Sequence, residues 1–182
     1  MNIDKGIKER RSIRNFKKKD VSWDKIHEIL ESCIYAPCAG GIQNWRLVVS
    51  KNKGQLNQIC FNQEAVVKAD FLAVVCSDNE DLKRHYKDHW DIFSIQNTSA
   101  AVQNMMLKAH SMKIGSCWIG IYREPDLKAL LKIPDEVDIH AVLAFGYPDE
   151  KPEIPLRARL HSIIGYDKYG NNSKDSLPLI KK

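Results

Sequence analysis

The sequence has few of the features that mark common metal, disulfide and nucleotide sites. Its five cysteines are scattered and odd in number, with no CxxC pair, which argues against a disulfide framework or a zinc site and fits a reducing compartment. The six histidines form no HExxH pattern, and His85 and His89, four residues apart, lack a carboxylate at the expected spacing. We therefore predict no metal site. GxGxxG and Walker A sequences are also absent, so nothing supports a Rossmann or P-loop nucleotide site.

Long apolar runs and a signal peptide are missing as well. The longest apolar runs, such as 141–147, are far too short to span a membrane, and Met1 leads directly into charged residues. We therefore expect a cytoplasmic protein that binds no membrane. The net charge of +5 is mild and comes without an RNA- or DNA-binding motif, so we expect no nucleic-acid partner. The basic balance is compatible with an anionic small-molecule ligand.

The length and composition that are present predict one globular domain. A chain of 182 residues is long enough for one domain with a full core, whereas two domains would each be small. Hydrophobic residues make up 43% of the chain and charged residues 28%, as in ordinary globular proteins. We expect a single domain over 1–182, in which the proline-, glycine- and charge-rich tail from Pro148 extends over a surface rather than folding alone.

Apolar periodicity predicts helices and strands mixed along the chain, as in an α/β or α+β sandwich of one sheet and several helices. Helices are expected at 3–14, 23–35, 55–61, 95–112 and 125–131, and strands at 46–50, 71–76, 116–121 and 139–145. The strand at 71–76 is apolar on both faces, which predicts a central place in the sheet. No conformation is predicted for the polar and aromatic stretch 77–93.

Two arginine clusters near opposite ends of the chain are candidate phosphate-binding groups. Arg10, Arg11 and Arg14 surround a serine at position 12, and guanidinium groups bind phosphate bidentately beside such a hydroxyl. Arg157 and Arg159 alternate in an extended segment, which points both side chains the same way. Taken alone, each cluster is more simply interpreted as solvated surface charge. The sequence does not show whether the two clusters meet.

Two segments rich in small residues are candidate surfaces for a flat heterocycle. The loop 36–45 contains adjacent glycines, so its backbone amides can approach a ring closely, and Gln43 can both donate and accept hydrogen bonds. A tight turn between a helix and a strand is the simpler interpretation of this loop. The glycines of the segment 115–120 either admit a ring plane or mark a strand end against a crowded helix, and we weigh these two interpretations equally.

Taken together and in order, these stretches resemble the nitroreductase family. Residues 10–16 resemble its RRSxRxF motif, 36–45 its APSxxNxQPW motif, and 101–120 its AxQNxxLxA…GxGxxW segment. Residues 130–134, 145–148 and 155–159 resemble its later LLxIP, xGYP and PxKxR signatures. No single motif is decisive. Their colinearity carries the resemblance.

The resemblance implies an α+β fold, a nitroreductase-like α/β sandwich with a mixed central sheet flanked by helices. Two chains would form a domain-exchanged homodimer that encloses two FMN molecules at its interface, with 160–182 as a C-terminal extension packing on the partner subunit. A reduced nicotinamide, NADPH or NADH, would pass hydride to FMN. A small electron-poor acceptor, such as a nitroaromatic or a quinone, would then be reduced at the same site in ping-pong order.

The resemblance also assigns FMN contacts residue by residue. The phosphate, ribityl chain and pyrimidine edge would be held by Arg10, Arg11, Ser12 and Arg14, with Arg157 and Arg159 completing the phosphate clamp. Against the isoalloxazine would lie Pro37, Cys38 and Ala39 of the other subunit, with Trp118, Ile119 and Gly120 lining the opposite side of the ring. No residue is predicted as catalytic, because the flavin itself carries the hydride chemistry.

Three departures from the family pattern fall in the loop. Gly41, which is also assigned to the cofactor site, stands where the family has asparagine, Asn44 where it has proline, and Cys38 where serine is usual. These changes alter hydrogen bonding near the flavin and bear on substrate preference more than on FMN binding. The region between Phe61 and Ile95 is too short for a large helical excursion, so we expect an open pocket or one closed by 77–93.

Three alternatives stay open from the sequence. The chain could be a specialised flavin-fragmenting or dehalogenating enzyme of the same fold, or a flavin-binding protein without turnover. A basic scaffold or nucleic-acid module is the third, and it predicts a colourless protein with salt-sensitive polyanion binding.

Overall fold

The computed structural model describes residues 2–172, so Met1 and 173–182 lie outside the described part. By its contacts the chain divides into two compact units, Met1–Pro152 and Glu153–Lys182. The sheet and all seven α-helices found among the described residues belong to the first unit. The expectation of one domain over 1–182 stays a prediction.

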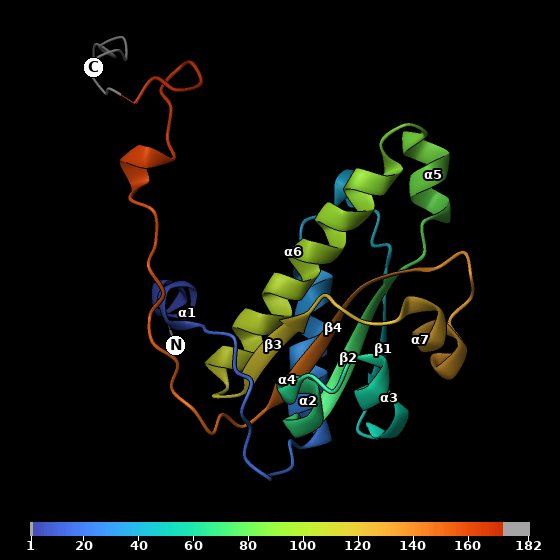
Figure 1. Cartoon of the computed structure of the whole chain (residues 1–182). Coiled ribbons are helices and arrows are strands. Elements are labelled where there is room, and N and C mark those ends of the chain that lie inside the picture. The colour runs from blue at the N-terminus through green and yellow to red at the C-terminus, as the bar shows by residue number, and fades with distance from the viewer. Residues whose placement is uncertain (1, 173–182) are drawn as a thin grey trace. The chain divides into compact units, whose positions relative to one another are not determined.

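The first unit is built on one four-stranded sheet (Figure 1). Its strands are β1 (Trp45–Ser50), β2 (Phe71–Ser77), β3 (Gly115–Ile119) and β4 (Asp138–Gly146), in the order β1-β2-β4-β3. Every residue of β2 is buried, and β2 lies inside the sheet, which confirms the prediction from its apolar run. All three strand pairings are antiparallel, so the expected mixed sheet was wrong for these four strands. Among the described residues, parallel pairing is limited to the isolated bridge between Ser12 and Ser116.

The helices agree with the predicted segments in place but not always in their ends. They are α1 (Ile3–Glu9), α2 (Trp23–Glu31), α3 (Gly54–Ile59), α4 (Glu64–Lys68), α5 (Glu80–Tyr86), α6 (Trp90–Ser111) and α7 (Glu124–Leu131). The short helices α4 and α5 were not predicted. The helix expected over 3–14 ends at Glu9, because the following residues pair with β3 instead. No helix in the described part of the chain is long and apolar enough to cross a membrane.

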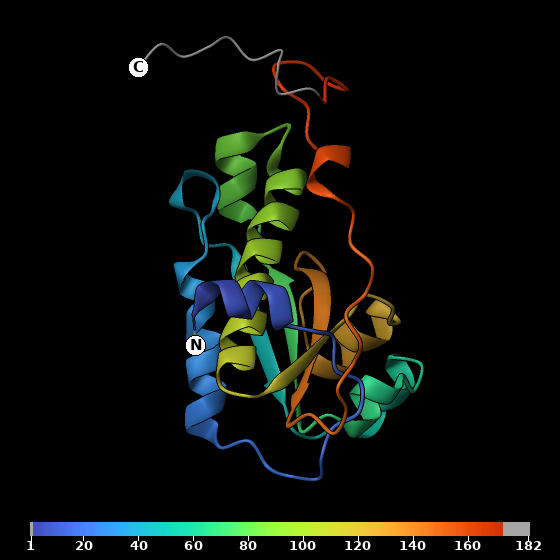
Figure 2. The same ribbon diagram turned by 90° about the vertical axis from the view of Figure 1, so that its left-hand side faces the viewer.

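Helices cover both faces of the sheet, giving three layers (Figure 1). Alternation along β2 sends Phe71, Ala73 and Val75 into the core beneath α2 and α6. Leu72 and Val74 enter the second core, beneath α3, α4 and α7. The predicted apolar face of α6 is confirmed, because Val102, Met105, Met106 and Ala109 are all buried. The amino-terminal helix α1 lies against α6 (Figure 2).

The second unit is described as far as Asn172. Residues 153–159 have no regular secondary structure and lead into a 3₁₀ turn at Leu160–Ser162. A tight turn follows, in which the backbone N–H of Tyr166 donates to the carbonyl of Asn171 at 2.7 Å. The C-terminal extension expected over 160–182 therefore lies partly outside the described residues, and its packing on a partner subunit stays a prediction.

The stacked pair Phe71 and Phe145 joins the two central strands. Their ring centroids are 4.8 Å apart at an interplanar angle of 12°, and neither side chain is exposed. We expect Phe71→Ala to lower the free energy of unfolding by about 3–5 kcal/mol, because it removes a buried ring and leaves a cavity. Denaturant unfolding followed by circular dichroism measures this change. Val67→Ala, at a 41% exposed position of α4, should change it little, and an equal loss in both variants would contradict the prediction.

Candidate active site

The segment 10–14, here called the arginine segment, lies against the edge strand β3. Ser12 forms a bridge with Ser116, and the backbone N–H of Ile13 donates to the carbonyl of Ser116 at 2.9 Å. Gly115 permits this approach, since a Cβ there would lie only 2.8 Å from Cγ1 of Ile13. Backbone pairing and the buried Ile13 side chain therefore hold the segment against β3.

The guanidinium of Arg11 is held in place by the chain beside it. Its Nη1 donates to the carbonyl oxygens of Lys8 at 2.8 Å and of Arg10 at 2.7 Å. Its Nε is buried and has no hydrogen-bond partner within the described structure. A buried donor without an acceptor carries a desolvation cost. An anionic ligand oxygen would remove that cost with a charge-assisted hydrogen bond.

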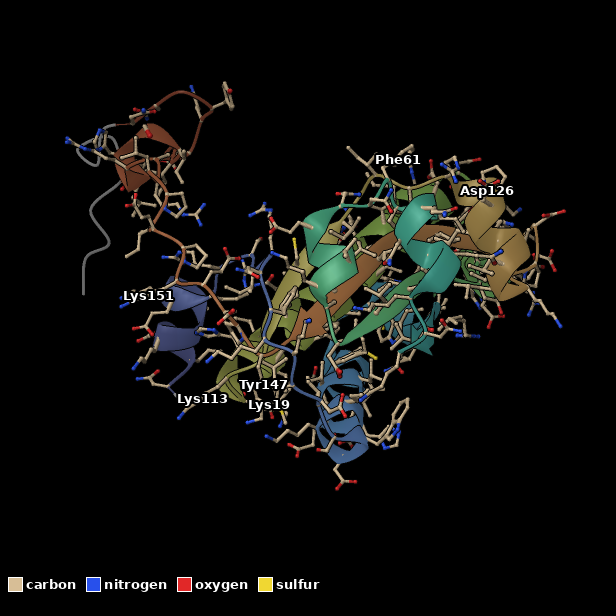
Figure 3. All side chains as sticks on the ribbon, turned by 60° about the horizontal axis from the view of Figure 1, so that its bottom comes forward. Lys19, Phe61, Lys113, Asp126, Tyr147 and Lys151 are labelled. Atoms are coloured by element: carbon tan, nitrogen blue, oxygen red, sulfur yellow. The ribbon has the colours of Figure 1, made fainter. Side chains whose placement is uncertain are left out.

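The chain returns to the arginine segment after β4. The carboxylate of Glu150 accepts hydrogen bonds from the backbone N–H groups of Arg14 at 2.5 Å and Asn15 at 3.0 Å. These two hydrogen bonds, of which the one from Arg14 has the larger effect, hold the pKa of Glu150 below its ordinary value. Nearby, the ammonium of Lys19 lies 4.5 Å from the ring centroid of Tyr147, and the two are labelled side by side in Figure 3. The arginine segment is thus held between β3 and the stretch after β4.

The predicted ring-facing residues of β3 divide between its two faces. Ile119 is 3% exposed and belongs to the core, whereas Trp118 is 39% exposed on the other side of the strand. Gly120 follows the strand, is exposed, and has no atom of the described chain within 4 Å of the position a Cβ would take. An exposed indole beside an open glycine suits the approach of a planar ligand.

The small-residue loop adopts a turn that depends on its glycines. Ala39–Gly41 forms a 3₁₀ turn in which Gly40 has φ 57° and Gly41 has φ 75°. Both values favour glycine. A Cβ on Gly40 would lie 2.3 Å from the hydroxyl of Tyr86, so α5, which arises from the stretch 77–93, lies directly on the loop. Gln43 donates to the carbonyl of Ile34 at 2.9 Å, which uses its amide within the protein. Pro37 is exposed, and Cys38 and Ala39 are half-buried.

A buried polar cluster behind this loop was not predicted. Asn44, Asn97, Asn79, Ser77 and Ser94 are each at most 3% exposed and are joined by hydrogen bonds. They come from the loop, β2, the turn before α5, and α6. The departure at Asn44 from the family's proline was the one signal in the sequence, but spacing alone does not bring the other members to it.

The arginine segment and the small-residue loop lie on opposite edges of the sheet. The loop leads into β1 and the arginine segment pairs with β3, and two strands separate these edges. Three strand spacings place the edges about 14 Å apart. The loop also lies at the Asp138 end of β4, through the pairing of Trp45 with Ser77 and Ser77 with Asp138, whereas Gly115 pairs with Gly146 at the other end. One chain therefore does not bring the two groups together.

The second arginine cluster belongs to the second unit. Arg157 and Arg159 are both exposed, and the backbone of Arg159 is extended with φ −75° and ψ 143°. Their contribution to the same phosphate as the arginine segment stays a prediction.

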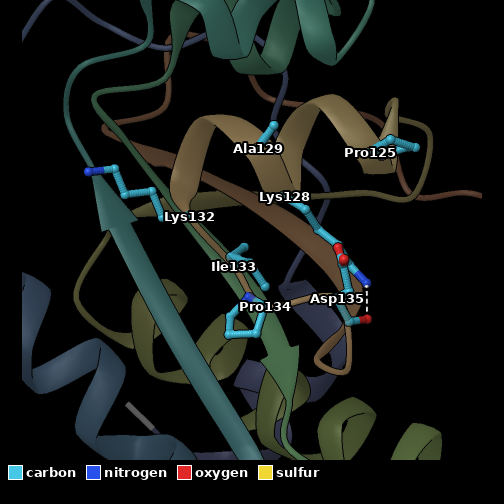
Figure 4. Close-up of a pocket in the computed structure, with 7 residues that line it drawn as sticks. All are labelled: Pro125, Lys128, Ala129, Lys132, Ile133, Pro134 and Asp135. Atoms are coloured by element: carbon cyan, nitrogen blue, oxygen red, sulfur yellow. Dashed lines mark hydrogen bonds between the residues drawn. The ribbon is translucent and has the colours of Figure 1, made fainter.

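The remaining reactive side chains do not form a site. Burial raises the pKa of both Cys60 and Cys76 to about 11, which keeps these thiols protonated at neutral pH. No group of three or more His, Cys, Asp or Glu suited to a metal ion occurs within residues 2–172. An open depression at the end of α7 is lined by Pro125, Lys128, Ala129, Lys132, Ile133, Pro134 and Asp135 (Figure 4). None of the predicted site residues lines it.

Comparison with known proteins finds matches that include the segments described above. The model of the nitroreductase family matches residues 7–91 and 55–147, which include the arginine segment, the loop and β3. The chain belongs to the nitroreductase family.

Relatives from this family match the chain over most of its length. A protein of Archaeoglobus fulgidus, provisionally named NADH dehydrogenase/NAD(P)H nitroreductase, is 36% identical over 156 residues, or 81% of this chain and 86% of that protein. The NADPH-flavin oxidoreductase of Vibrio harveyi is 25% identical over 179 residues, or 92% and 74%. The crystal structure of nitroreductase A from Vibrio parahaemolyticus superposes with a TM-score of 0.83 at 25% identity, covering 93% of this chain and 77% of that one. The predicted α+β nitroreductase fold is confirmed.

The packing of Gly115 against Ile13 makes a prediction about the arginine segment. We expect Gly115→Ala to lower the free energy of unfolding by about 1–3 kcal/mol, because the added methyl group overpacks a buried contact. Thermal and denaturant unfolding measure the loss. The matched variant Gly120→Ala adds the same methyl group where nothing lies within 4 Å and should leave stability unchanged. Equal stability of Gly115→Ala and the unmodified protein would show that the segment does not lie against β3.

Proposed function

We propose that this chain is an FMN-dependent oxidoreductase that uses NADH or NADPH to reduce small electron-poor acceptors, such as nitroaromatics and quinones. The observation that carries the proposal is the buried Nε of the Arg11 guanidinium, which has no hydrogen-bond partner in the described chain, on the fold of this family. The names of relatives support it, among them the NADPH-flavin oxidoreductase of Vibrio harveyi and the FMN reductase (NADPH) of Bacillus subtilis.

The residues of the arginine segment fit the phosphate of FMN. Arg11 offers a buried, pre-positioned donor, Arg14 an exposed guanidinium, and Ser12 a half-buried hydroxyl. Guanidinium groups match phosphate oxygens in geometry and keep their charge at all physiological pH values. Arg10 completes the segment, and Arg157 and Arg159 are proposed as further phosphate ligands from the second unit.

The surfaces proposed for the flavin ring combine small or exposed side chains with open glycine positions. Trp118 and Gly120 offer an exposed indole edge and an open backbone after β3. On the loop, Gly41 likewise has no atom within 4 Å of its Cβ position, and Cys38 and Ala39 present small side chains. Backbone without a side chain is what a planar ligand needs for close contact.

A homodimer would bring these two separated surfaces together, and we propose one. The loop and the arginine segment of one chain lie on opposite edges of its sheet, about 14 Å apart by strand spacing alone. A second copy, related by two-fold symmetry, supplies its loop to the first chain's arginine segment and receives the same in return. Such a reciprocal interface is the common form of homodimers. We propose that each FMN is bound by both chains.

The protein's own part in the reaction is to bind, orient and shield. Bound FMN would supply hydride transfer between a reduced nicotinamide and the acceptor. Arg11 and Arg14 would fix the phosphate, and the loop and β3 would set the ring plane. The protonated buried thiols Cys60 and Cys76 take no part. No side chain is proposed as an obligate acid or base.

The absorption spectrum of the purified protein tests the proposal. We expect a yellow protein whose flavin bands bleach when NADPH or NADH is added without oxygen, because the nicotinamide reduces bound FMN. The bleached bands should return when a nitroaromatic or a quinone is added. A colourless protein that takes up no added FMN would refute the proposal. Flavin that stays oxidised under excess NADPH and NADH would favour a flavin-binding protein without turnover.

The open position at Gly120 allows a test of where the ring lies. We expect Gly120→Ala to raise the Kd for FMN by about tenfold, because a methyl group on the proposed ring surface displaces the ring, and 1.4 kcal/mol corresponds to that factor. The melting temperature of the FMN-free protein should stay unchanged, since the added Cβ meets nothing within 4 Å. Fluorescence titration with FMN measures the affinity. Unchanged affinity would place the ring elsewhere.

A further inference from the structure

A buried chain of hydrogen bonds begins at the small-residue loop. The backbone N–H of Ala39 donates to Oδ1 of Asn97 at 2.9 Å, and Nδ2 of Asn97 donates to Oδ1 of Asn44 at 3.0 Å. Nδ2 of Asn44 then donates to Oδ1 of Asn79 at 2.9 Å, and Nδ2 of Asn79 donates to the carboxylate of Asp138 at 2.8 Å. Three amides thus link a loop N–H to a carboxylate on β4.

The direction of this chain is set independently at both ends. A backbone N–H can only donate, so Asn97 must face Ala39 with its oxygen. An ionised carboxylate can only accept, so Asn79 must face Asp138 with its nitrogen. Both ends require the same orientation of Asn44 between them. Rotating any one of the three amides would place donor against donor or acceptor against acceptor.

A branch of the chain ends at His140. Ser77 Oγ accepts from Asn79 at 3.0 Å and from Ser94 at 2.9 Å, and it lies 2.8 Å from Nε2 of His140. The same Nε2 lies 3.2 Å from Ser94 Oγ, so His140 contacts both serines of the branch. Burial lowers the pKa of His140, against opposing contributions from Asp138 and Glu124.

Asn97 is the member that holds the loop. Its Oδ1 binds the N–H of Ala39 and its Nδ2 binds the carbonyl of Ile42 at 3.2 Å, so one amide spans the whole turn. The turn contains two glycines at positive φ and has little stiffness of its own. Asn44 in turn orients Asn97, and it stands where the family motif has proline.

We propose that Asn97 and Asn44 are positioning residues for the flavin reaction. Through the directed chain from Ala39 to Asp138 and His140, they set the conformation in which the loop meets the flavin ring. This inference rests on the proposed function for the role of the loop. The chain of hydrogen bonds itself does not depend on any bound cofactor, so the two can be tested separately.

The decisive variant removes a distant member of the chain. Ser77→Ala deletes a hydroxyl on β2 whose hydrogen bonds go to Asn79, Ser94 and His140 rather than to the loop or Asn97, and the change in volume is small. Asn97→Ala deletes the contact with the loop directly. Asn104→Ala is the matched control, because Asn104 lies on the same helix and donates to the carbonyl of Ser32 at 3.3 Å, outside the chain. The double variant of Ser77 and Asn97 completes a mutant cycle.

Amide hydrogen exchange at Ala39 in the FMN-free protein is the first measurement. We expect faster exchange in Ser77→Ala and Asn97→Ala and unchanged exchange in Asn104→Ala, because the members of a directed chain support one another. Unchanged exchange at Ala39 in Ser77→Ala would overturn the proposed chain, whether or not the protein binds FMN.

The second measurement uses the FMN-loaded protein. We expect Ser77→Ala and Asn97→Ala to keep FMN bound, to shift the shape of its visible absorption bands, and to lower kcat/KM for NADPH or NADH by about tenfold to a hundredfold, the scale for a misplaced reacting group. The Ser77 effect should vanish when Asn97 is already alanine. Additive effects, or a loss of FMN in place of a spectral shift, would overturn the positioning role. A wild-type protein that takes up no FMN would refute the proposed function and this role of the loop with it.

Discussion

Much of this structure depends on the close approach of the arginine segment to the edge strand β3. That approach requires Gly115, because a Cβ there would lie only 2.8–3.1 Å from three side-chain atoms of Ile13. Because of this pairing, α1 ends at Glu9, and the arginine segment is extended and partly buried rather than part of an exposed helix. Once the backbone and Ile13 hold the segment, the Nε of Arg11 is buried without an acceptor in the described chain, at a desolvation cost that the fold carries.

The sequence predicted the parts of the fold that follow from local periodicity. The apolar run of β2 gave its central place, and the spacing of Val102, Met105 and Met106 gave the buried face of α6. Periodicity did not predict where the arginine segment leaves its helix, because the competing partner, Ser116, is more than 100 positions away. The antiparallel pairing of the four strands was not predicted for the same reason, since the direction of pairing is set by contacts between distant segments.

The candidate site was predictable as a set of residues but not as an arrangement. Colinear motifs identified the arginine segment, the loop and β3, and the family match supports that reading. They did not show that the loop and the arginine segment lie on opposite edges of one sheet. The polar cluster behind the loop was beyond sequence reasoning, because asparagine and serine are most often surface residues. The cluster forms only because the loop, β2, the turn before α5, and α6 converge in the folded chain.

The two edges of the sheet differ in whether their buried polar groups already have hydrogen-bond partners. This difference determines how each edge responds to mutation. At β3, the Nε of Arg11 is buried without a hydrogen-bond partner in the described chain, so an anionic ligand that reached it would satisfy it. At the loop, every amide of the buried chain is already satisfied by a neighbour, so a ligand adds nothing and any deletion leaves a buried partner unpaired. If the proposed function holds, affinity for the cofactor and the shape of the surface against its ring therefore depend on different residues. Mutation at the first edge would then alter how tightly the cofactor is bound, whereas mutation at the second would alter the surface on which it reacts.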